Sequence, residues 1–411
     1  MAQGERDLKD TLVIERELWR DGPPHELFSQ LRSECPVHWS AEIPEFPDQD
    51  GFWSITTADD VHAVSRDWET FSSELGGITA LTGALLPLEL VRSMFIGMDP
   101  PKHDRLKALF QRGFTPKRIA DHEDPIREIT RRVLDGLAGR ESCDLVSDVA
   151  QPVVSRVIGS FMGIPPEDDA VWARLMNATV GAGDRDLNPR GPRSVVEREV
   201  PEIFARCREL IAARREHPTD DLTSVLVHAE IDGEHLQEHE IVMGFVLLMA
   251  AGNDSTKATY CSGMRAIMED PEQRLLLLED PAAIEGAVEE SLRMFPAFAH
   301  FRRTATRDCQ IGGQSIRAGE KIVLWYASSN RDESRYENPH RFDARRNPDH
   351  QAFGAGGRHF CLGTALARLE LRILFAETLE RYPEIALAGT PLHAESPWIN
   401  QLKTLPVWLK P

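Results

Sequence analysis

Residues 353–363 read Phe353-Gly-Ala-Gly-Gly-Arg-His-Phe-Cys-Leu-Gly363, with glycines first and a cysteine two residues after a histidine. Glycines let a backbone approach a ligand closely and leave amide groups free to donate. A thiol at the start of a helix meets the positive end of the helix dipole, which favours the thiolate. A thiolate is a soft metal ligand, so the stretch predicts a metal or cofactor site at Cys361.

The residues after Gly363 follow a helical pattern. Apolar side chains recur every three or four positions, at Leu366, Leu369, Ile373 and Ala376. This spacing is typical of an amphipathic helix with one buried face. The less specific interpretation of the whole stretch is a buried structural cysteine after a glycine turn, and motifs elsewhere in the chain decide between the two.

The stretch resembles the haem-binding loop of the cytochrome P450 haem-thiolate monooxygenases, written F-G-x-G-x-H-x-C-x-G. The matching residues are Phe353, Gly354, Gly357, His359, Cys361 and Gly363. The Phe-Gly pair lies one residue further from the cysteine than in the commonest form, and this longer variant is similar to bacterial members that hydroxylate sterol side chains and methyl-branched lipids. The resemblance implies haem b as cofactor and Cys361 as the ligand of its iron.

Composition limits the other possibilities. The chain has 411 residues and a net charge of −19. We find no repeat, linker or low-complexity segment, so we expect a single domain over residues 1–411. The negative charge disfavours nucleic acid and anionic membranes as partners. Six cysteines without a CxxC pair argue against a zinc site or a disulfide framework.

Two features argue against a membrane anchor. Residues 1–10 are rich in charge, unlike a secretory signal. The longest apolar run, residues 241–251, is much shorter than the roughly 20 residues that span a bilayer. We therefore expect a soluble, cytoplasmic protein.

The longest periodic segment, residues 238–270, predicts a helix through the middle of the protein. Polar residues interrupt it at Asp254, Ser255 and Thr256, and a buried carboxylate is costly unless something uses it. The segment resembles the family's A-G-x-D/E-T-T motif, which crosses the haem. This implies that Ala251 contacts the haem and that Asp254 and Ser255 relay protons towards dioxygen. Thr256 is a substitute donor, because Ser255 stands where threonine is usual; the alternative is a polar kink without chemistry.

The propionates of a haem need cationic partners. Residues 98–107 resemble the family's D-x-P-x-H-x-x-x-R segment, in which His103 matches and Lys107 replaces the usual arginine. The strand around residues 297–305 resembles the one that supplies a propionate-binding arginine, which we assign to Arg303 rather than Arg302. With His359, these residues form the implied propionate site.

Three further residues are implied to hold the scaffold. Glu290 and Arg293 match the family's E-x-x-R motif, and Arg341 lies in Pro339-His-Arg-Phe342, which resembles P-x-R-F. In the family the second arginine completes a buried triad with the first pair. We therefore expect Glu290, Arg293 and Arg341 to be structural.

The resemblance implies a mainly α fold with small β-sheets, in which the haem lies between the long distal helix and the proximal cysteine loop and helix. A glycine-containing apolar loop at residues 76–95 and a polar loop at 181–192 are candidates for a pocket wall and a lid; both have simpler interpretations as packed or solvated connections. We expect the substrate pocket to be lined by Ile78, Leu86, Phe95, Met176, Leu247, Ala250, Phe298 and Ile399.

The implied activity is insertion of one oxygen atom from O2 into a C–H bond of a hydrophobic substrate. A sterol side chain or a methyl-branched lipid is the first expectation, and a terpenoid or other secondary metabolite is the second. We expect a monomer that receives electrons from a ferredoxin and its reductase, docked on basic residues near the proximal side: Arg105, Lys107, Arg112, Lys117, Arg118 and Arg358. A peroxide-using hydroxylase and a non-catalytic haem sensor are the alternatives.

Overall fold

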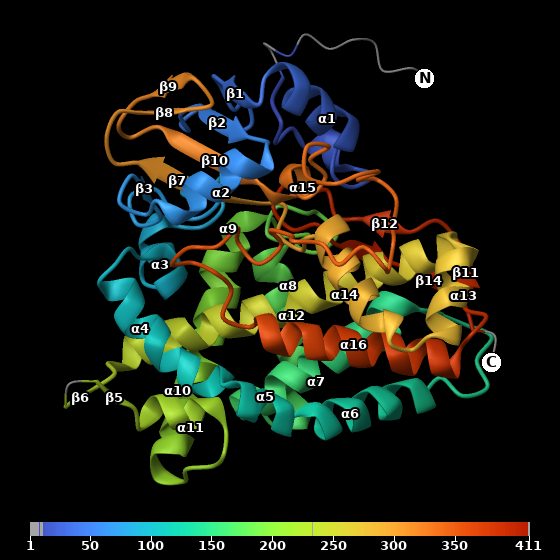
Figure 1. The fold of residues 1–411 in the computed structure, drawn as a ribbon. Coiled ribbons are helices and arrows are strands. Elements are labelled where there is room, and N and C mark those ends of the chain that lie inside the picture. The colour runs from blue at the N-terminus through green and yellow to red at the C-terminus, as the bar shows by residue number, and fades with distance from the viewer. Residues whose placement is uncertain (1–7, 9–10, 232, 410–411) are drawn as a thin grey trace.

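The computed structural model describes residues 8, 11–231 and 233–409. Figure 1 shows a smaller part rich in strands, built from N-terminal segments (blue) and residues near 300–325 (orange), beside a larger helical part. The β-part is therefore built from two segments far apart in the sequence, residues 37–72 and residues 300–325. The connection from one to the other is the helical part.

The main sheet joins segments that are far apart in the sequence. Its strands lie in the order β1 (Val37–Ser40), β2 (Phe52–Ile55), β10 (Lys321–Trp325), β7 (His300–Ala305) and β3 (Phe71–Ser72). β2 and β10 are parallel, and every other neighbouring pair is antiparallel. Side chains alternate between the two faces of a strand, so Arg302 and Arg303 of β7 point to opposite faces.

The other strands form small sheets that tie chain segments together. One has three strands: β4 (Ser142–Asp144), β11 (Ala386–Leu387) and β14 (Pro406–Trp408). The three pairs are β5 (Glu230–Ile231) with β6 (Glu234–His235), β8 (Cys309–Ile311) with β9 (Gln314–Ile316), and β12 (Leu392–His393) with β13 (Leu402–Thr404).

Helices make up the larger part. Those of nine residues or more are α1 (His25–Glu34), α2 (Ala58–Arg66), α4 (Lys102–Gln111), α6 (Glu123–Asp135), α7 (Gln151–Met162), α8 (Asp169–Val180), α10 (Val200–Glu216), α12 (Glu238–Glu269), α13 (Pro271–Glu279), α14 (Ala283–Met294) and α16 (Thr364–Arg381). The shorter ones are α3 (Leu88–Arg92), α5 (Pro116–Asp121), α9 (Pro192–Ser194), α11 (Leu222–Val227) and α15 (Tyr326–Ser329).

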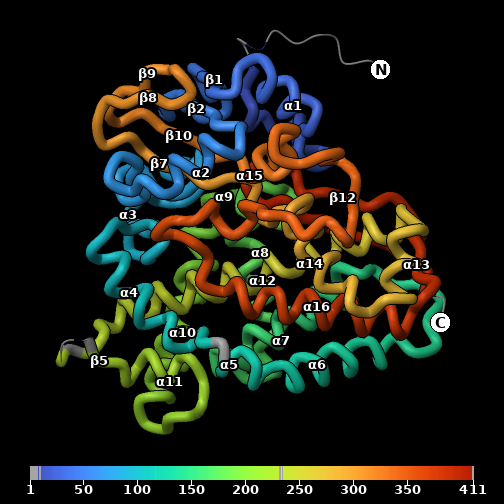
Figure 2. Tube along the Cα trace, viewed as in Figure 1, coloured from blue at the N-terminus to red at the C-terminus, as the bar shows by residue number. Residues whose placement is uncertain are grey.

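The 32-residue helix α12 is the centre of the helical part. A capping box starts it, in which the Gln237 N–H donates to Glu240 Oε2 at 2.9 Å. It packs against α7 and α8 and also against α14 and α16, and Figure 2 shows α12 and α16 side by side. The main hydrophobic core surrounds it, with Phe110, Phe245 and Phe375 fully buried.

The prediction of a mainly α fold with small sheets is confirmed. The two helices expected from the pattern at residues 238–270 and after Gly363 are α12 and α16. Within the part of the chain that the structure describes, no helix is long and apolar enough to cross a membrane.

Candidate active site

The cysteine loop precedes α16 and is shaped by its glycines. Gly354, Gly356 and Gly357 have φ values of 98°, 84° and 81°, in the region that favours glycine. A Cβ atom on Gly357 would lie 2.6 Å from the carbonyl oxygen of Ser65, so only glycine fits there. The Cys361 N–H donates to the carbonyl of Phe353 at 2.9 Å, which closes the loop.

The loop forms one wall of a cavity of about 200 Å³, and α12 forms another. Cys361 lies in the first wall, with Phe353, Gly354, His359 and Gly363. Ala251, Ser255 and Thr256 lie in the α12 wall. The structure therefore brings together the predicted ligand and two of the three predicted relay residues around one space.

Cys361 lines this cavity, and although the residue as a whole is exposed, protein atoms surround its sulfur. Burial raises its pKa, while the N–H of Gly363 and the charge of Lys107 act in the opposite direction. A buried thiol with donors arranged around it suits a bond to a cation that stabilises the thiolate. Among the described residues, no group of three or more histidine, cysteine or carboxylate side chains gathers to hold a metal ion.

Four basic side chains meet on the side of the cavity near β7 and α4. The rings of His103 and His359 lie 4.3 Å apart between centroids, and both residues line the cavity with Lys107 and Arg303. Burial, followed by the charges of Arg303, His103 and Lys107, lowers the pKa of His359 well below its usual value. The four predicted propionate partners therefore form one cluster.

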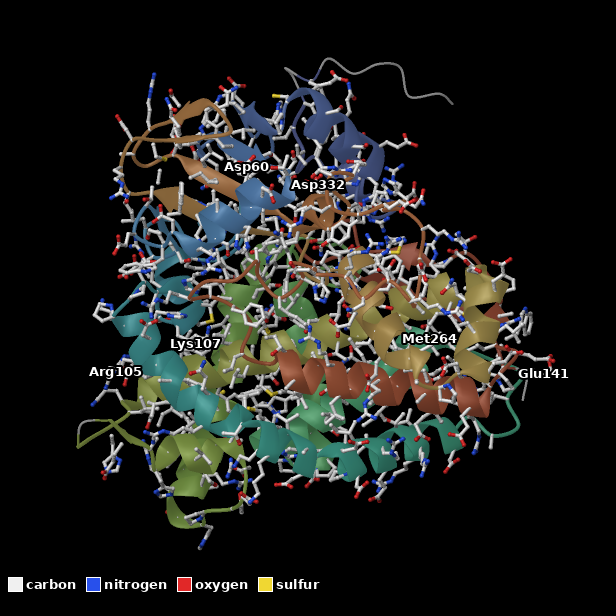
Figure 3. All side chains as sticks on the ribbon, in the orientation of Figure 1. Asp60, Arg105, Lys107, Glu141, Met264 and Asp332 are labelled. Atoms are coloured by element: carbon white, nitrogen blue, oxygen red, sulfur yellow. The ribbon has the colours of Figure 1, made fainter. Side chains whose placement is uncertain are left out.

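Arg303 is the least compensated member of this basic cluster. It is 4% exposed, its guanidinium donates to the carbonyl of Arg302 at 2.8 Å, and within the described parts of the chain no carboxylate lies within 4.0 Å of it. Burying such a charge is costly without an anion. Lys107 lies on α4 with Arg105 (Figure 3). Its ammonium donates to the carbonyls of Arg358 and Phe360, and these bonds link α4 to the cysteine loop.

The three relay candidates do not share one orientation. The Ser255 hydroxyl donates to the carbonyl of Ala251 at 2.6 Å, within α12. Asp254 is fully buried and lies outside the cavity wall, with its carboxylate 2.6 Å from Lys257 Nζ. The structure therefore places the hydroxyls of residues 255 and 256 at the cavity and the carboxylate of Asp254 on another side of the helix.

Comparisons with known proteins identify the family of this chain. The sequence pattern of the cytochrome P450 family matches residues 282–393. The chain is 38% identical over 395 residues to a methyl-branched lipid omega-hydroxylase of Mycobacterium tuberculosis, covering 94% of this chain and 90% of that protein. A steroid C26-monooxygenase of Rhodococcus jostii is 32% identical over 392 residues, covering 93% of this chain and 81% of that protein. The chain belongs to the cytochrome P450 family.

Solved structures show the same fold. A cytochrome P450 of Mycobacterium marinum in complex with pseudoionone matches with a TM-score of 0.92 at 36% identity, covering 99% of this chain and 100% of that chain. Family membership makes this P450 an oxidoreductase of the monooxygenase class with a haem-thiolate cofactor. The residues present fit such a group: a thiol, apolar walls, and a buried Arg303 without a carboxylate partner on the side where propionates need cations.

One carboxyl group of the P450 cavity was not predicted from the sequence: Glu370 of α16. It is 3% exposed, and burial raises its pKa to about 8, against a smaller lowering by a hydrogen bond with Thr256. Glu370 is therefore protonated at neutral pH. A signal was present in the sequence, because a charged residue stands beside Leu369 and one turn after Leu366 in the buried stripe of the helix.

The predicted substrate residues divide into two groups. Phe95, Leu247 and Phe298 line the cavity, together with unpredicted apolar neighbours: Ile96, Phe114, Ile158, Leu248 and Phe301.

The other five lie elsewhere. Leu86 lines a separate small pocket with Leu81 and Trp398, and the Ile78 carbonyl accepts from the Arg302 N–H in the wall of the sheet. The remaining three pack into hydrophobic clusters: Met176, Ala250 and Ile399. These five residues are apolar, as the prediction required, but their side chains pack between secondary-structure elements and do not line the cavity.

The prediction for Arg341 is wrong. Glu290 and Arg293 are fully buried and paired through two bonds of 2.8 and 2.7 Å, as expected. The third member is Arg346, whose Nε donates to Glu290 Oε1 at 3.0 Å. The Arg341 side chain is 63% exposed, with its nearest recorded carboxylate, Glu272, at 3.9 Å. The turn after Phe342 directs the later arginine inward, which the motif alone does not reveal.

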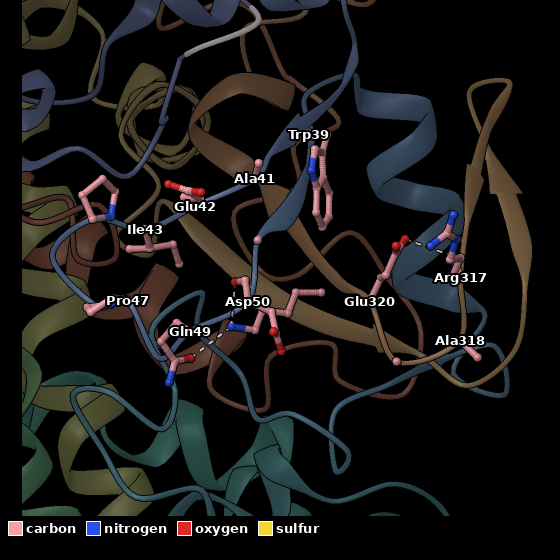
Figure 4. A pocket seen from close by; sticks show the side chains of 14 residues that line it. Trp39, Ala41, Glu42, Ile43, Pro47, Gln49, Asp50, Arg317, Ala318 and Glu320 are labelled. Atoms are coloured by element: carbon pink, nitrogen blue, oxygen red, sulfur yellow. Dashed lines mark hydrogen bonds between the residues drawn. The ribbon is translucent and has the colours of Figure 1, made fainter.

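A wider groove of about 800 Å³ lies at an edge of the main sheet (Figure 4). Residues from the segments 39–51 and 317–321 line it, and Lys321 Nζ donates to Gln49 Oε1 and the Asp50 carbonyl, both at 3.0 Å. No predicted site residue lines this groove. Size alone therefore does not mark the functional site of this P450.

Proposed function

We propose that this P450 inserts one oxygen atom from O2 into a C–H bond of a methyl-branched lipid or a sterol side chain. The observation that carries the proposal is the cavity with the Cys361 thiol in one wall and the Ser255 and Thr256 hydroxyls in another. When bound, the haem supplies the activation of dioxygen and the transfer of oxygen to carbon. The remaining steps belong to residues of the chain.

Binding of haem b is the first of these steps. The Cys361 sulfur would hold the iron, and Arg303, His103 and His359 would neutralise the propionates through charge-assisted bonds. Apolar side chains such as Leu247, Leu366 and Phe353 would cover the ring faces. Phe353 is itself fixed by the Arg368 guanidinium, which lies 4.8 Å from its ring centroid.

Proton supply is the second step. We assign the Ser255 hydroxyl as the proton donor towards the cavity, with Asp254 as the acid behind it and Thr256 as a substitute donor. The Ser255 hydroxyl donates its one hydrogen to the Ala251 carbonyl, and its oxygen can still accept a hydrogen bond from another donor. Donation towards the cavity would require the hydroxyl to rotate away from that carbonyl.

The choice of substrate rests on the relatives and on the apolar cavity. Two relatives are named as a methyl-branched lipid omega-hydroxylase and a steroid C26-monooxygenase. Apolar side chains that line the cavity include Leu247, Leu248, Phe298 and Phe301. A terpenoid is the second candidate, supported by the relative that was solved with pseudoionone.

We propose a ferredoxin as electron donor and a monomer as the working unit. The face near the cysteine loop carries Arg358 and the 43% exposed ring of Phe360. Three of the predicted docking residues already pair within the chain, Arg105 with Glu240, Arg118 with Asp220 and Arg358 with Asp104. An acidic partner would therefore compete most easily for Arg112 and Lys117.

Two measurements test the proposal. A spectral titration of the ferric holoprotein with cholestenone, a methyl-branched fatty acid and a monoterpene should show displacement of water by one of the first two. Consumption of dioxygen with reductant and that compound, with a hydroxylated product, separates an enzyme from a haem sensor. Binding of the monoterpene alone would favour the second candidate, and a product formed only with peroxide would favour a peroxide-using hydroxylase.

A further inference from the structure

The groove at the edge of the main sheet reaches a buried lysine, Lys321 of β10. This residue is 6% exposed, yet it lines the groove together with Gln49 and Asp50. Its ammonium has three donors, and two of them are used, by Gln49 Oε1 and by the Asp50 carbonyl. Both acceptors are uncharged, so one donor and the positive charge of Lys321 are left for a further partner.

A second buried cation, Arg302 of β7, lies on the same face of the sheet. It is also 6% exposed, and its one recorded side-chain bond runs from Nη2 to Thr304 Oγ1 at 3.4 Å. Thr304 is directly opposite Lys321 in the β7–β10 ladder, so this bond directs the guanidinium towards Lys321. Within the described residues, Arg302 Nε has no hydrogen-bond partner. Two neighbouring buried cations therefore have unused donors.

Neither cation is paired with a carboxylate. Within the parts of the chain that the structure describes, no carboxylate oxygen lies within 4.0 Å of Lys321 or Arg302. The neighbouring acid Glu320 accepts instead from the Trp53 indole at 2.7 Å. Burial, followed by the charge of Arg302, lowers the pKa of Lys321 to about 8, against the opposing charge of Asp50. Because buried charges without counterions are costly, the groove provides a binding site for an anion.

The rest of the groove favours a ligand that also has an apolar part. Figure 4 shows Trp39 and Pro47 among the lining side chains, and Pro44 lines the groove as well. The Trp39 ring packs on the Trp53 ring, with 5.1 Å between centroids and 50° between planes. The volume of about 800 Å³ is far larger than one inorganic ion fills. The lining therefore suits an organic acid, with its carbon skeleton against these rings and its carboxylate at Lys321.

We propose that this groove binds a small amphiphilic carboxylate, as a second ligand site separate from the cavity at Cys361. The carboxylate completes the donor set of Lys321, and the charge of Arg302 adds to the attraction. None of the described residues lines both the groove and the cavity, so an acid bound in the groove does not contact the haem site. The site therefore exists whether or not the proposed hydroxylation is correct.

Calorimetric titration of the haem-loaded protein with octanoate tests the site. Saturation with phenylimidazole, a nitrogen ligand for haem iron, first blocks the cavity, so that the heat reports binding elsewhere. We expect one octanoate per chain, with an affinity that falls as the ionic strength rises. Lys321→Met should weaken binding by about tenfold, and Lys321→Arg should stay within about threefold of the wild type. Lys102→Met, at an exposed lysine of α4, is the matched control and should bind octanoate like the wild type.

Asp50→Asn tests the same charge balance without changing a buried side chain. Asp50 is exposed, and its charge repels an arriving carboxylate, so the variant should bind octanoate about threefold more tightly. Wild-type affinity in both Lys321→Met and Asp50→Asn overturns the proposal. If Lys321→Met does not fold, wild-type affinity in Asp50→Asn overturns it alone. Octanol bound as tightly as octanoate would remove the role of charge, and inorganic phosphate bound as tightly would rule out an organic acid as the preferred ligand.

Discussion

At the scale of single residues, side chains that are adjacent in the sequence of the site contact different parts of the structure. Asp254 and Ser255 are adjacent in the chain, yet one is bonded to Lys257 and the other faces the cavity. Glu370 belongs to a buried helix stripe and still reaches the cavity. Helical geometry separates neighbours by about 100° around the axis, so adjacency in a motif does not mean contact.

Replacing Ser255 by alanine should separate electron use from product formation. The variant should retain haem and substrate binding, because the hydroxyl bonds only within α12 in this structure. Loss of the donor should divert electrons to peroxide, measured as the ratio of product to reductant consumed. A ratio equal to that of the wild type would move the relay to Thr256.

Replacing Glu370 by glutamine should flatten the dependence of stability on pH. The pKa of Glu370 is raised from 4.5 to about 8 in the folded protein, so between these values the unfolded chain has released a proton that the folded chain keeps. The contribution of Glu370 to the free energy of unfolding is complete below the pKa of the unfolded chain. It is lost as the pH rises from that pKa to the pKa of the folded protein, by about 1.4 kcal/mol per pH unit. Denaturant unfolding of the wild type and of Glu370→Gln, near the two pKa values, measures how the free energy of unfolding depends on pH. The same pH dependence in both proteins would contradict the prediction.

Arg346 and Arg341 provide a matched pair for the scaffold. Arg346→Ala removes a bond to the fully buried Glu290 and should lower the free energy of unfolding by about 2 kcal/mol. Arg341→Ala, at an exposed side chain, should change it by less than about 0.5 kcal/mol. Equal effects in chemical denaturation would restore Arg341 to the triad.

At the scale of elements, the cysteine loop is held by a close approach to α2. Gly357→Ala would place a Cβ atom 2.6 Å from the Ser65 carbonyl and force a φ of 81° on alanine. The strained backbone should cost about 1 to 2 kcal/mol and shift the loop. The haem content of the purified protein should therefore fall by more than half. Gly183→Ala, where a Cβ would lie 3.7 Å from Leu85, is the control and should retain full haem content. Full haem content in both variants would show that the loop tolerates the shift.

At the scale of the whole molecule, the order of elements could be predicted far better than their contacts. The fold class followed from the family resemblance that the glycine-rich cysteine loop and the polar interruption of α12 carry, because both motifs are local. Packing was not predictable from residue type: Met176 and Ile399 are as apolar as Leu247, yet only Leu247 reaches the cavity. Which arginine pairs with Glu290 likewise depends on a turn whose direction no local pattern encodes.

Electron transfer also belongs to this scale, because it requires a second protein. Among the described residues, no ion pair of Arg112 or Lys117 is recorded, so charge reversal at both should leave the fold and substrate binding unchanged. We expect KM for an acidic ferredoxin to rise by about tenfold and to lose part of its dependence on salt. Arg193→Glu on α9 is the control, and an equal effect there would remove the docking role from this face.

The central claim is that the sulfur of Cys361 binds the iron of a haem. The absorption spectrum of the reduced protein under carbon monoxide tests it most directly, in the wild type, in Cys361→Ala and in Cys35→Ala. The thiolate-ligated band should be present in the wild type and in Cys35→Ala and absent from Cys361→Ala. An undiminished band in Cys361→Ala, or its absence from the haem-loaded wild type, would contradict the claim.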